Sequence, residues 1–278
     1  MLPRLRRRLF AHPWHAVVLV VVPATAVAAV FAASGCSDLI DAIPTTTDAA
    51  PTDAGMTIIG SDGAVDCTAE DAGFAPVNDL VCTNLYSDFG SKALSPGVIP
   101  YDPGLPLWAD GATVKRWVLL PGSGQKIDTT NMNEWQFPVG TKFWQEFTVT
   151  GHRVETRYYW KRGDNDWVRG SYAWSSDETK ATYSGGGATD VGGSSYTIPS
   201  QDQCDQCHLG REDRILGFEA VSLTSGAAKI TGASLSDLVT AAPGALSVPD
   251  DGSGKGAAAL AWLHSNCGTS CHSNSPGS

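Results

Sequence analysis

Residues 142–161, KFWQEFTVTGHRVETRYYWK, carry the clearest secondary-structure pattern of the chain. In each half of this stretch, apolar residues recur at alternate positions and polar or charged residues stand between them. The alternating apolar residues are Phe143, Phe147, Val149, Val154, Tyr158 and Trp160. The residues of opposite parity include Lys142, Glu146, Thr148, Arg153, Glu155, Arg157 and Lys161. A period of two with one charged face is typical of a half-buried antiparallel strand, so we expect two such strands here.

The sequence on both sides extends this β pattern. Residues 113–120 and 167–174 are further strand candidates, and the turn residues at 163–165 fit a hairpin between two of the runs. Glycine-rich sequence at 185–193 then marks a loop or a domain boundary. We therefore expect a mainly β domain over residues 67–197, folded as an antiparallel sandwich or in a jelly-roll-like way.

The segment after residue 197 has a different character. Residues 234–242 and 256–265 have the composition of short helices, with Ser234 available as an N-cap and Pro243 as a stop signal. We therefore expect a small α-helical domain over residues 198–278.

The N-terminus has the three-part layout of an export signal. Four arginines lie between residues 4 and 8, an apolar stretch covers residues 16–30, and small residues lead into Cys36. The apolar stretch is shorter than the ~20 residues that a membrane span needs. The pattern resembles a bacterial lipoprotein signal, so we expect residues 1–35 to be removed and Cys36 to carry lipid. The alternatives are an ordinary signal peptide and an uncleaved anchor.

Residues 36–66 read as a disordered tether, because Asp, Ala, Thr, Gly and Pro dominate them and large apolar groups are few. The chain beyond the signal is strongly acidic. Four of the 19 Lys and Arg residues lie before residue 36 and none of the 29 Asp and Glu residues does, so the remainder has a net charge of −14. This charge argues against nucleic acid as a partner. It suits solubility, or attraction to a basic protein.

Seven cysteines divide into groups with different expected fates. Export places them in an oxidising compartment. Cys36 is assigned to lipid, and we expect Cys67 and Cys82 to form a disulfide across a short loop. The other four form two clusters that each end in histidine. These clusters are Cys204-Asp205-Gln206-Cys207-His208 and Cys267-Gly268-Thr269-Ser270-Cys271-His272.

The first cluster has the C-x-x-C-H spacing of covalent haem attachment. The thiols of Cys204 and Cys207 would form thioethers with the haem vinyl groups, and two intervening residues let both sulfurs meet one porphyrin edge. His208 would then lie under the iron as the proximal ligand. A thiol redox couple is the alternative, but no βαβ pattern surrounds the motif. We expect haem c at this cluster.

The second cluster has three intervening residues instead of two. We expect a second haem c at Cys267, Cys271 and His272, because a Cys-His motif recurs in one exported domain and an apolar helical pattern precedes it. A Cys267–Cys271 disulfide is one alternative. A zinc site of all four clustered cysteines is another, although 59 residues separate the two pairs and both histidines would be left out.

The distal haem ligands are less well defined by the sequence. Cytochromes c often use Met opposite His, but no Met follows either motif. Besides His208 and His272, we expect His264 to be the best candidate for a metal ligand, opposite His208 at the first haem. His152 and Met132 are weaker candidates. Without a distal ligand the iron would be five-coordinate and open to small ligands or peroxide.

Five segments carry a family resemblance. They are YDPGLPLWADGA (101–112), WQFPVGT (135–141), RVETR (153–157), the stretch 172–174, and IPS (198–200), which leads into the first motif. From about residue 97 to its end, the chain resembles bacterial dihaem c-type cytochromes with an N-terminal β domain and a C-terminal cytochrome c domain. The resemblance implies haem at both clusters. The second motif departs from the family by one extra residue. The sequence also ends six residues after His272, where the family has more of the cytochrome domain, so the resemblance suggests a chain truncated at its C-terminus.

These features predict an electron-transfer cytochrome of the cell envelope, lipid-anchored to a membrane on the periplasmic or outer-membrane side, with a basic redox partner protein. The runner-up is a dihaem peroxidase or oxidase, which needs one open haem with an acid or base beside it. A third alternative is an envelope polysaccharide-binding module, because seven of the nine Trp residues lie between Trp108 and Trp174. Core packing is the commoner role of Trp.

Overall fold

The computed structural model describes residues 58–60, 63–65, 67, 77–122, 124–208, 210–213 and 215–269. The expected signal region 1–35, Cys36, Cys271 and His272 lie outside the described residues, as does most of the expected tether. The predictions that fall on them stay predictions. No helix within the described ranges is long and apolar enough to cross a membrane.

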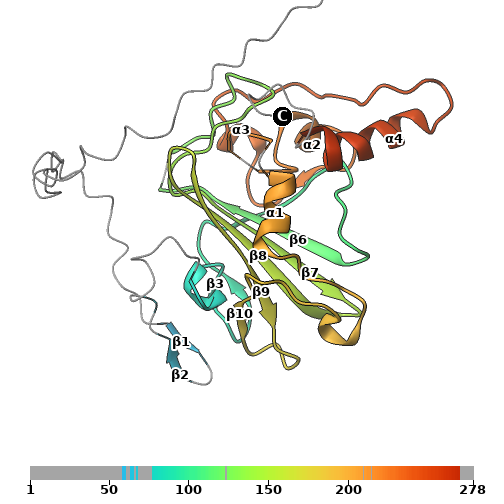
Figure 1. Ribbon diagram of the computed structural model, residues 1–278. Coiled ribbons are helices and arrows are strands. Elements are labelled where there is room, and N and C mark those ends of the chain that lie inside the picture. The colour runs from blue at the N-terminus through green and yellow to red at the C-terminus, as the bar shows by residue number, and fades with distance from the viewer. Residues whose placement is uncertain are drawn as a thin grey trace, which may run out of the picture. The chain divides into compact units, whose positions relative to one another are not determined.

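A seven-stranded sheet is the largest element of the described chain, and all its strand pairings are antiparallel (Figure 1). In spatial order the strands are β10 (Ala181–Tyr183), β9 (Asp166–Trp174), β8 (His152–Gly163), β7 (Lys142–Val149), β6 (Thr113–Leu119), β5 (Ile99–Asp102) and β11 (Lys229–Ile230). Two small sheets pair β1 (Ile58–Gly60) with β2 (Gly63–Val65) and β3 (Tyr86–Asp88) with β4 (Ala93–Leu94). The prediction of a mainly β, antiparallel fold is confirmed.

The helical elements are short and mostly C-terminal. They are η1 (Leu80–Thr83), η2 (Val191–Gly193), α1 (Gln201–His208), α2 (Ala220–Thr224), α3 (Leu235–Leu238), α4 (Gly256–Leu263) and η3 (His264–Gly268). The helix expected over 234–242 ends early, at Leu238. The reason is a tertiary contact: Val239 leaves the helix to form a parallel bridge with Ile127, and the Ile127 amide donates to the Leu238 carbonyl at 2.8 Å.

The hairpin between β8 and β9 lies where the turn residues predicted it. Gly163 pairs with Asp166, which leaves Asp164 and Asn165 as the turn. Asn165 adopts a φ of 57°. Asparagine tolerates this left-handed backbone better than most residues, so the turn chemistry sets the register of the two longest strands.

The central strands are buried on both faces, which corrects the expectation of a solvent-facing charged side. One face, here called the C-terminal face, carries Tyr101, Phe143, Tyr159 and Trp167 and is covered by residues 215–239. The opposite face, called the N-terminal face, carries Trp117, Trp144, Tyr158 and Tyr172 and is covered by residues 80–89. Alternation alone does not show a second covering layer, because it reports only the difference between the two faces.

The buried charged residues of β7 and β8 each have an oppositely charged partner. Glu146 is 1% exposed and accepts a hydrogen bond from Arg153 Nε at 2.8 Å. Glu155 is 0% exposed and binds Arg157 Nε at 2.8 Å. Lys161 is buried against Asp213, with 2.6 Å between Nζ and Oδ1. Buried charges require such pairing.

The C-terminal segment shares its core with the sheet. Phe218 packs edge-on against Tyr101, with ring centroids 4.8 Å apart, and against Phe143 at 5.3 Å. Ile215 and Leu223 belong to the same cluster. Among the described residues, the large sheet is therefore faced by loops, short helices and a small hairpin rather than by a second sheet of similar size, unlike the expected sandwich or jelly roll. The boundary at residue 197 stays a prediction.

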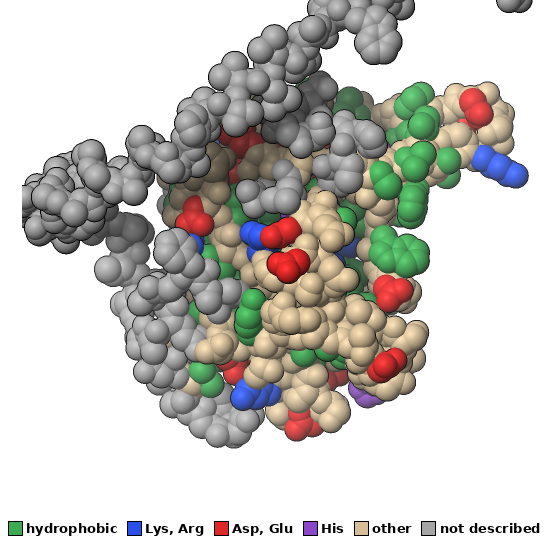
Figure 2. Space-filling view, in the orientation of Figure 1, with side chains coloured by type: hydrophobic (Ala, Val, Ile, Leu, Met, Phe, Trp, Pro, Cys, Tyr) green, Lys and Arg blue, Asp and Glu red, His purple; other side chains and the backbone are tan. Residues whose placement is uncertain are grey.

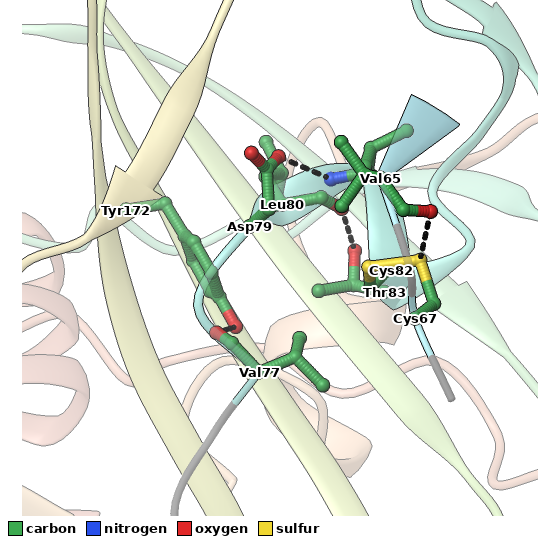
Figure 3. The surroundings of a disulfide bond; sticks show 9 residues. Val65, Cys67, Val77, Asp79, Leu80, Cys82, Thr83 and Tyr172 are labelled. Carbon is green, nitrogen blue, oxygen red and sulfur yellow. Dashed lines mark hydrogen bonds between the residues drawn. A yellow bond between two sulfur atoms is a disulfide. The ribbon is translucent and has the colours of Figure 1, made fainter. Parts of the chain in front are cut away.

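A disulfide joins Cys67 to Cys82, the pair that the sequence analysis expected (Figure 3). The bond connects Cys67 to η1, which contains Cys82. Close to it, Tyr172 Oη donates a hydrogen bond to the Val77 carbonyl at 2.9 Å (Figure 3). The two cysteines are 15 residues apart in sequence.

Replacing Cys82 by Ser is expected to lower the free energy of unfolding by about 3 kcal/mol, the entropy that a loop of this length contributes. Urea unfolding of the oxidised, haem-free protein, made without cytochrome maturation, measures the change. Cys267→Ser, which removes a free cysteine, is the matched control and should change stability little. An equal loss in both variants would contradict a specific role of the Cys67–Cys82 bond.

Candidate haem-attachment site

Helix α1 begins at a capping box encoded by Ser200 and Gln203. The Ser200 amide donates to Gln203 Oε1 at 2.9 Å, and the Gln203 amide donates to Ser200 Oγ at 3.4 Å. The reciprocal bonds satisfy amides that a helix start leaves unpaired. The helix therefore starts just before the first Cys-His cluster. The Ser200 and Gln203 pair is a helix-start signal that can be read in the sequence.

The first cluster occupies the C-terminal half of α1. Cys204, Cys207 and His208 stand at positions i, i+3 and i+4, so they share one face of the helix. Both cysteines are free thiols, with Cys207 exposed and Cys204 half-buried. None of the side chains of α1 is fully buried. The motif is accessible to a large group that would attach to both sulfurs.

Two contacts hold α1 on the C-terminal face of the sheet. The His208 ring lies against Tyr159 of β8, with centroids 4.8 Å apart and planes tilted by 31°. Asp205 forms an ion pair with Arg169 of β9. Tyr159 and Arg169 are direct cross-strand neighbours, so both anchors come from one point of the sheet. Figure 2 shows acidic side chains with a basic one beside them over α1.

The sheet beneath α1 sets the electrostatics of Cys204. Burial raises the pKa of the Cys204 thiol, while the nearby Arg157 guanidinium opposes that rise. Arg157 is itself held by Glu155, which also accepts a hydrogen bond from Tyr196 Oη at 2.6 Å. The sequence does not indicate Tyr159, Arg157 and Arg169 as neighbours of the motif, because only the strand register brings them under α1.

In the haem-free protein, Cys207 is expected to react with iodoacetamide several-fold faster than Cys204. Cys207 is exposed, whereas Cys204 is half-buried with a raised pKa, so less of it is thiolate at a given pH. Timed alkylation at pH 8 followed by peptide mass spectrometry measures the two rates. Equal rates would mean that α1 does not rest on the sheet in the way described.

The second cluster is described only as far as Thr269. Cys267 lies half-buried in η3, the π-helical turn that continues α4. Asn266 fixes this turn to the 101–112 segment, because its Oδ1 accepts from the Trp108 amide at 2.6 Å and its Nδ2 donates to the Pro106 carbonyl at 3.0 Å. A segment of the family resemblance thus lies beside the second cluster.

The helix leading to Cys267 has its apolar residues on the outside. The buried side chains of α4, η3 and the C-cap residue that follows are small: Ala261, Ser265 and Thr269. Leu260 and Leu263 are 47% and 50% exposed, and Figure 2 shows hydrophobic side chains gathered over α4. Surface helices normally show the reverse arrangement.

The distal-ligand candidates lie in different places. His264 opens η3, and its Nε2 is 3.6 Å from Glu219 Oε1, so this nitrogen faces a carboxylate. His152 is at the start of β8, seven residues from Tyr159 and therefore roughly 23 Å from it along the strand. Met132 is 49% exposed. Within the described part of the chain, no three His, Cys, Asp or Glu side chains form a group that could hold a metal ion.

A cavity of about 340 Å³ lies elsewhere on the molecule. Its lining includes Trp117 and Glu146, whose side chains belong to the face opposite α1. Glu146 is already bound by Arg153 and by the Tyr86 hydroxyl. Arg116 and Tyr101 of the C-terminal face also line the cavity, whereas no described residue of α1 does.

Comparison with protein-family models, curated proteins and solved structures finds no match for this chain. The functional argument therefore rests on the residues and their geometry.

Five of the seven Trp residues between Trp108 and Trp174 lie in the core of the protein. They are Trp117, Trp135, Trp144, Trp167 and Trp174. Trp160 is half-buried and Trp108 is 68% exposed. A cluster of exposed Trp residues that would grip a glycan is not seen among the described residues, which favours the core-packing role of Trp.

Proposed function

We propose that the protein is a c-type cytochrome that transfers electrons in the cell envelope, with haem bound covalently through Cys204 and Cys207 and with His208 as an iron ligand. The observation that carries the proposal is α1 itself. Two free thiols and an imidazole share one face of an accessible helix, in the spacing of haem attachment.

The residues around the motif suit this group. Cys204 and Cys207 would supply the two thioethers, and the Tyr159 ring packed on His208 would limit rotation of the imidazole. The Arg169–Asp205 ion pair fixes the helix on the sheet. When bound, the haem supplies an iron that cycles between the ferric and ferrous states. The protein contributes ligation, burial and charge.

The remaining parts of the proposal follow from the sequence. A second haem at Cys267, Cys271 and His272 would cover the outward apolar residues of α4. Lipid on Cys36 would keep the protein at the membrane, and the net charge of −14 beyond residue 35 would favour a basic redox partner. The resemblance to dihaem c-type cytochromes with a β domain supports the same function.

Optical redox titration of the haem-loaded protein tests the proposed function. An electron carrier is expected to show fully reversible reduction and oxidation and a spectrum that peroxide does not change. A high-spin band that shifts with peroxide, together with turnover of a reducing substrate, would contradict the electron-carrier proposal and support a peroxidase.

A further inference from the structure

Strand register places three polar side chains in one row on the sheet beneath α1. Arg116 of β6 pairs with Gln145 of β7, and Gln145 pairs with Arg157 of β8. Directly opposed residues of antiparallel strands point to the same face. Arg157 and Tyr159 are two residues apart on β8, so the row lies on the C-terminal face, where Tyr159 meets His208.

Arg116 is half-buried, and its guanidinium is the one of the three in this region that makes no ion pair among the described residues. Arg157 is neutralised by two hydrogen bonds to Glu155, at 2.8 and 3.0 Å, and Arg169 is paired with Asp205. Among the described residues, no acidic side chain lies within ion-pair distance of Arg116, and its buried Nε has no hydrogen-bond partner.

Such an arrangement is costly unless an anion completes it. Burial lowers the pKa of Arg116, and the neighbouring Arg157 adds to that effect, while Tyr101 and Asp102 act in the opposite direction. An arginine remains protonated at neutral pH even so. A buried donor left unpaired destabilises a protein, and more so when it belongs to a charged group. The site therefore calls for a carboxylate or a similar anion.

The proposed cofactor brings carboxylates to this face. A haem carries its two propionates on the edge opposite the vinyl groups, and the vinyl groups would be held by Cys204 and Cys207. Arg157 lies within electrostatic range of Cys204, and Arg116 follows two strands further on, about 10 Å away at the usual strand spacing. Arginine and carboxylate form the strongest common ion pair of proteins.

We propose that Arg116 binds a propionate of the haem attached at Cys204 and Cys207. The inference rests on the proposed function and deepens it, because it assigns a counter-charge that helps to set the potential of the first haem. Arg116 is a positioning residue in this account: it touches the cofactor at its propionate edge and not at the iron.

Two measurements on Arg116→Met test the proposal. In haem-free protein, made without cytochrome maturation, the substitution is expected to raise the melting temperature, because it removes a half-buried guanidinium whose buried Nε lacks a hydrogen-bond partner. In haem-loaded protein, it is expected to lower the midpoint potential of one haem, since the lost positive charge had favoured the ferrous state. Arg116→Lys keeps the charge and should keep the potential near the wild-type value.

Lys180→Gln, which removes a positive charge from an exposed position before β10, is the control and should change neither quantity. An unchanged potential in haem-loaded Arg116→Met would overturn the proposal while leaving the haem in place. A lower melting temperature of haem-free Arg116→Met would also overturn it, because Arg116 would then already have a protein partner. A wild-type chain without covalent haem would overturn the proposed function as well.

Discussion

Asp213→Ala is expected to lower the free energy of unfolding by about 3–5 kcal/mol, because it leaves the buried Lys161 ammonium without its counter-charge. Asp213 Oδ1 lies 2.6 Å from Lys161 Nζ and accepts from Trp167 Nε1 at 3.2 Å, and Oδ2 accepts from the Phe137 amide at 2.5 Å. One carboxylate thus joins residues 210–213, which follow α1, to three parts of the β region. Urea unfolding followed by tryptophan fluorescence measures the loss.

A matched substitution separates burial from charge. Asp166→Ala removes a carboxylate from an ion pair with Arg162 in which the Asp166 side chain is 50% exposed. Surface pairs contribute about 0–1 kcal/mol, so this control should change stability little. Similar losses in Asp213→Ala and Asp166→Ala would show that the carboxylate of Asp213 is not buried against Lys161.

Cys204→Ser combined with Cys207→Ser is expected to abolish covalent haem at the first cluster, because no thioether can form there. In a host with cytochrome maturation, haem staining after denaturing electrophoresis should fall to the signal of the second cluster alone. Cys67→Ser with Cys82→Ser removes two cysteines from the disulfide and should leave haem stoichiometry unchanged. Undiminished haem staining of the Cys204, Cys207 double variant would show that α1 does not attach haem.

The sequence predicted the four long strands of the large sheet, β6 to β9, but not the short strands β5, β10 and β11. Alternation placed β7 and β8 within a residue or two of their ends, and the turn residues at 163–165 marked their link to β9. These features are local, so a single stretch of sequence contains them. Burial of both faces was not predictable in this way, because the covering residues 80–89 and 215–239 are distant in sequence.

Helix boundaries followed tertiary contacts rather than local signals. The pattern at 234–242 predicted more helix than α3 contains, since pairing of Val239 with Ile127 overrides the propensity of the remaining residues. Helix α1 was not predicted, although Ser200 and Gln203 formed a readable capping signal.

Some residues of the candidate site could be predicted from local sequence, and others could not. The spacing of Cys204, Cys207 and His208 is a sequence feature, and together with the family resemblance it suggested covalent haem. The supporting residues Tyr159, Arg169 and Arg116 came from the register of β6 to β9, which no spacing along the chain encodes. The second cluster is described structurally only up to Thr269, so its cofactor rests on the sequence.

Haem stoichiometry of the full chain tests the proposed covalent attachment of haem. The chain is expressed with its own signal in a bacterium that matures c-type cytochromes, and a pyridine haemochrome spectrum after denaturation gives covalent haem per protein. The account predicts two haems per chain, or one if only the Cys204, Cys207 and His208 cluster is loaded. A chain that folds, is exported and carries no covalent haem would contradict the account.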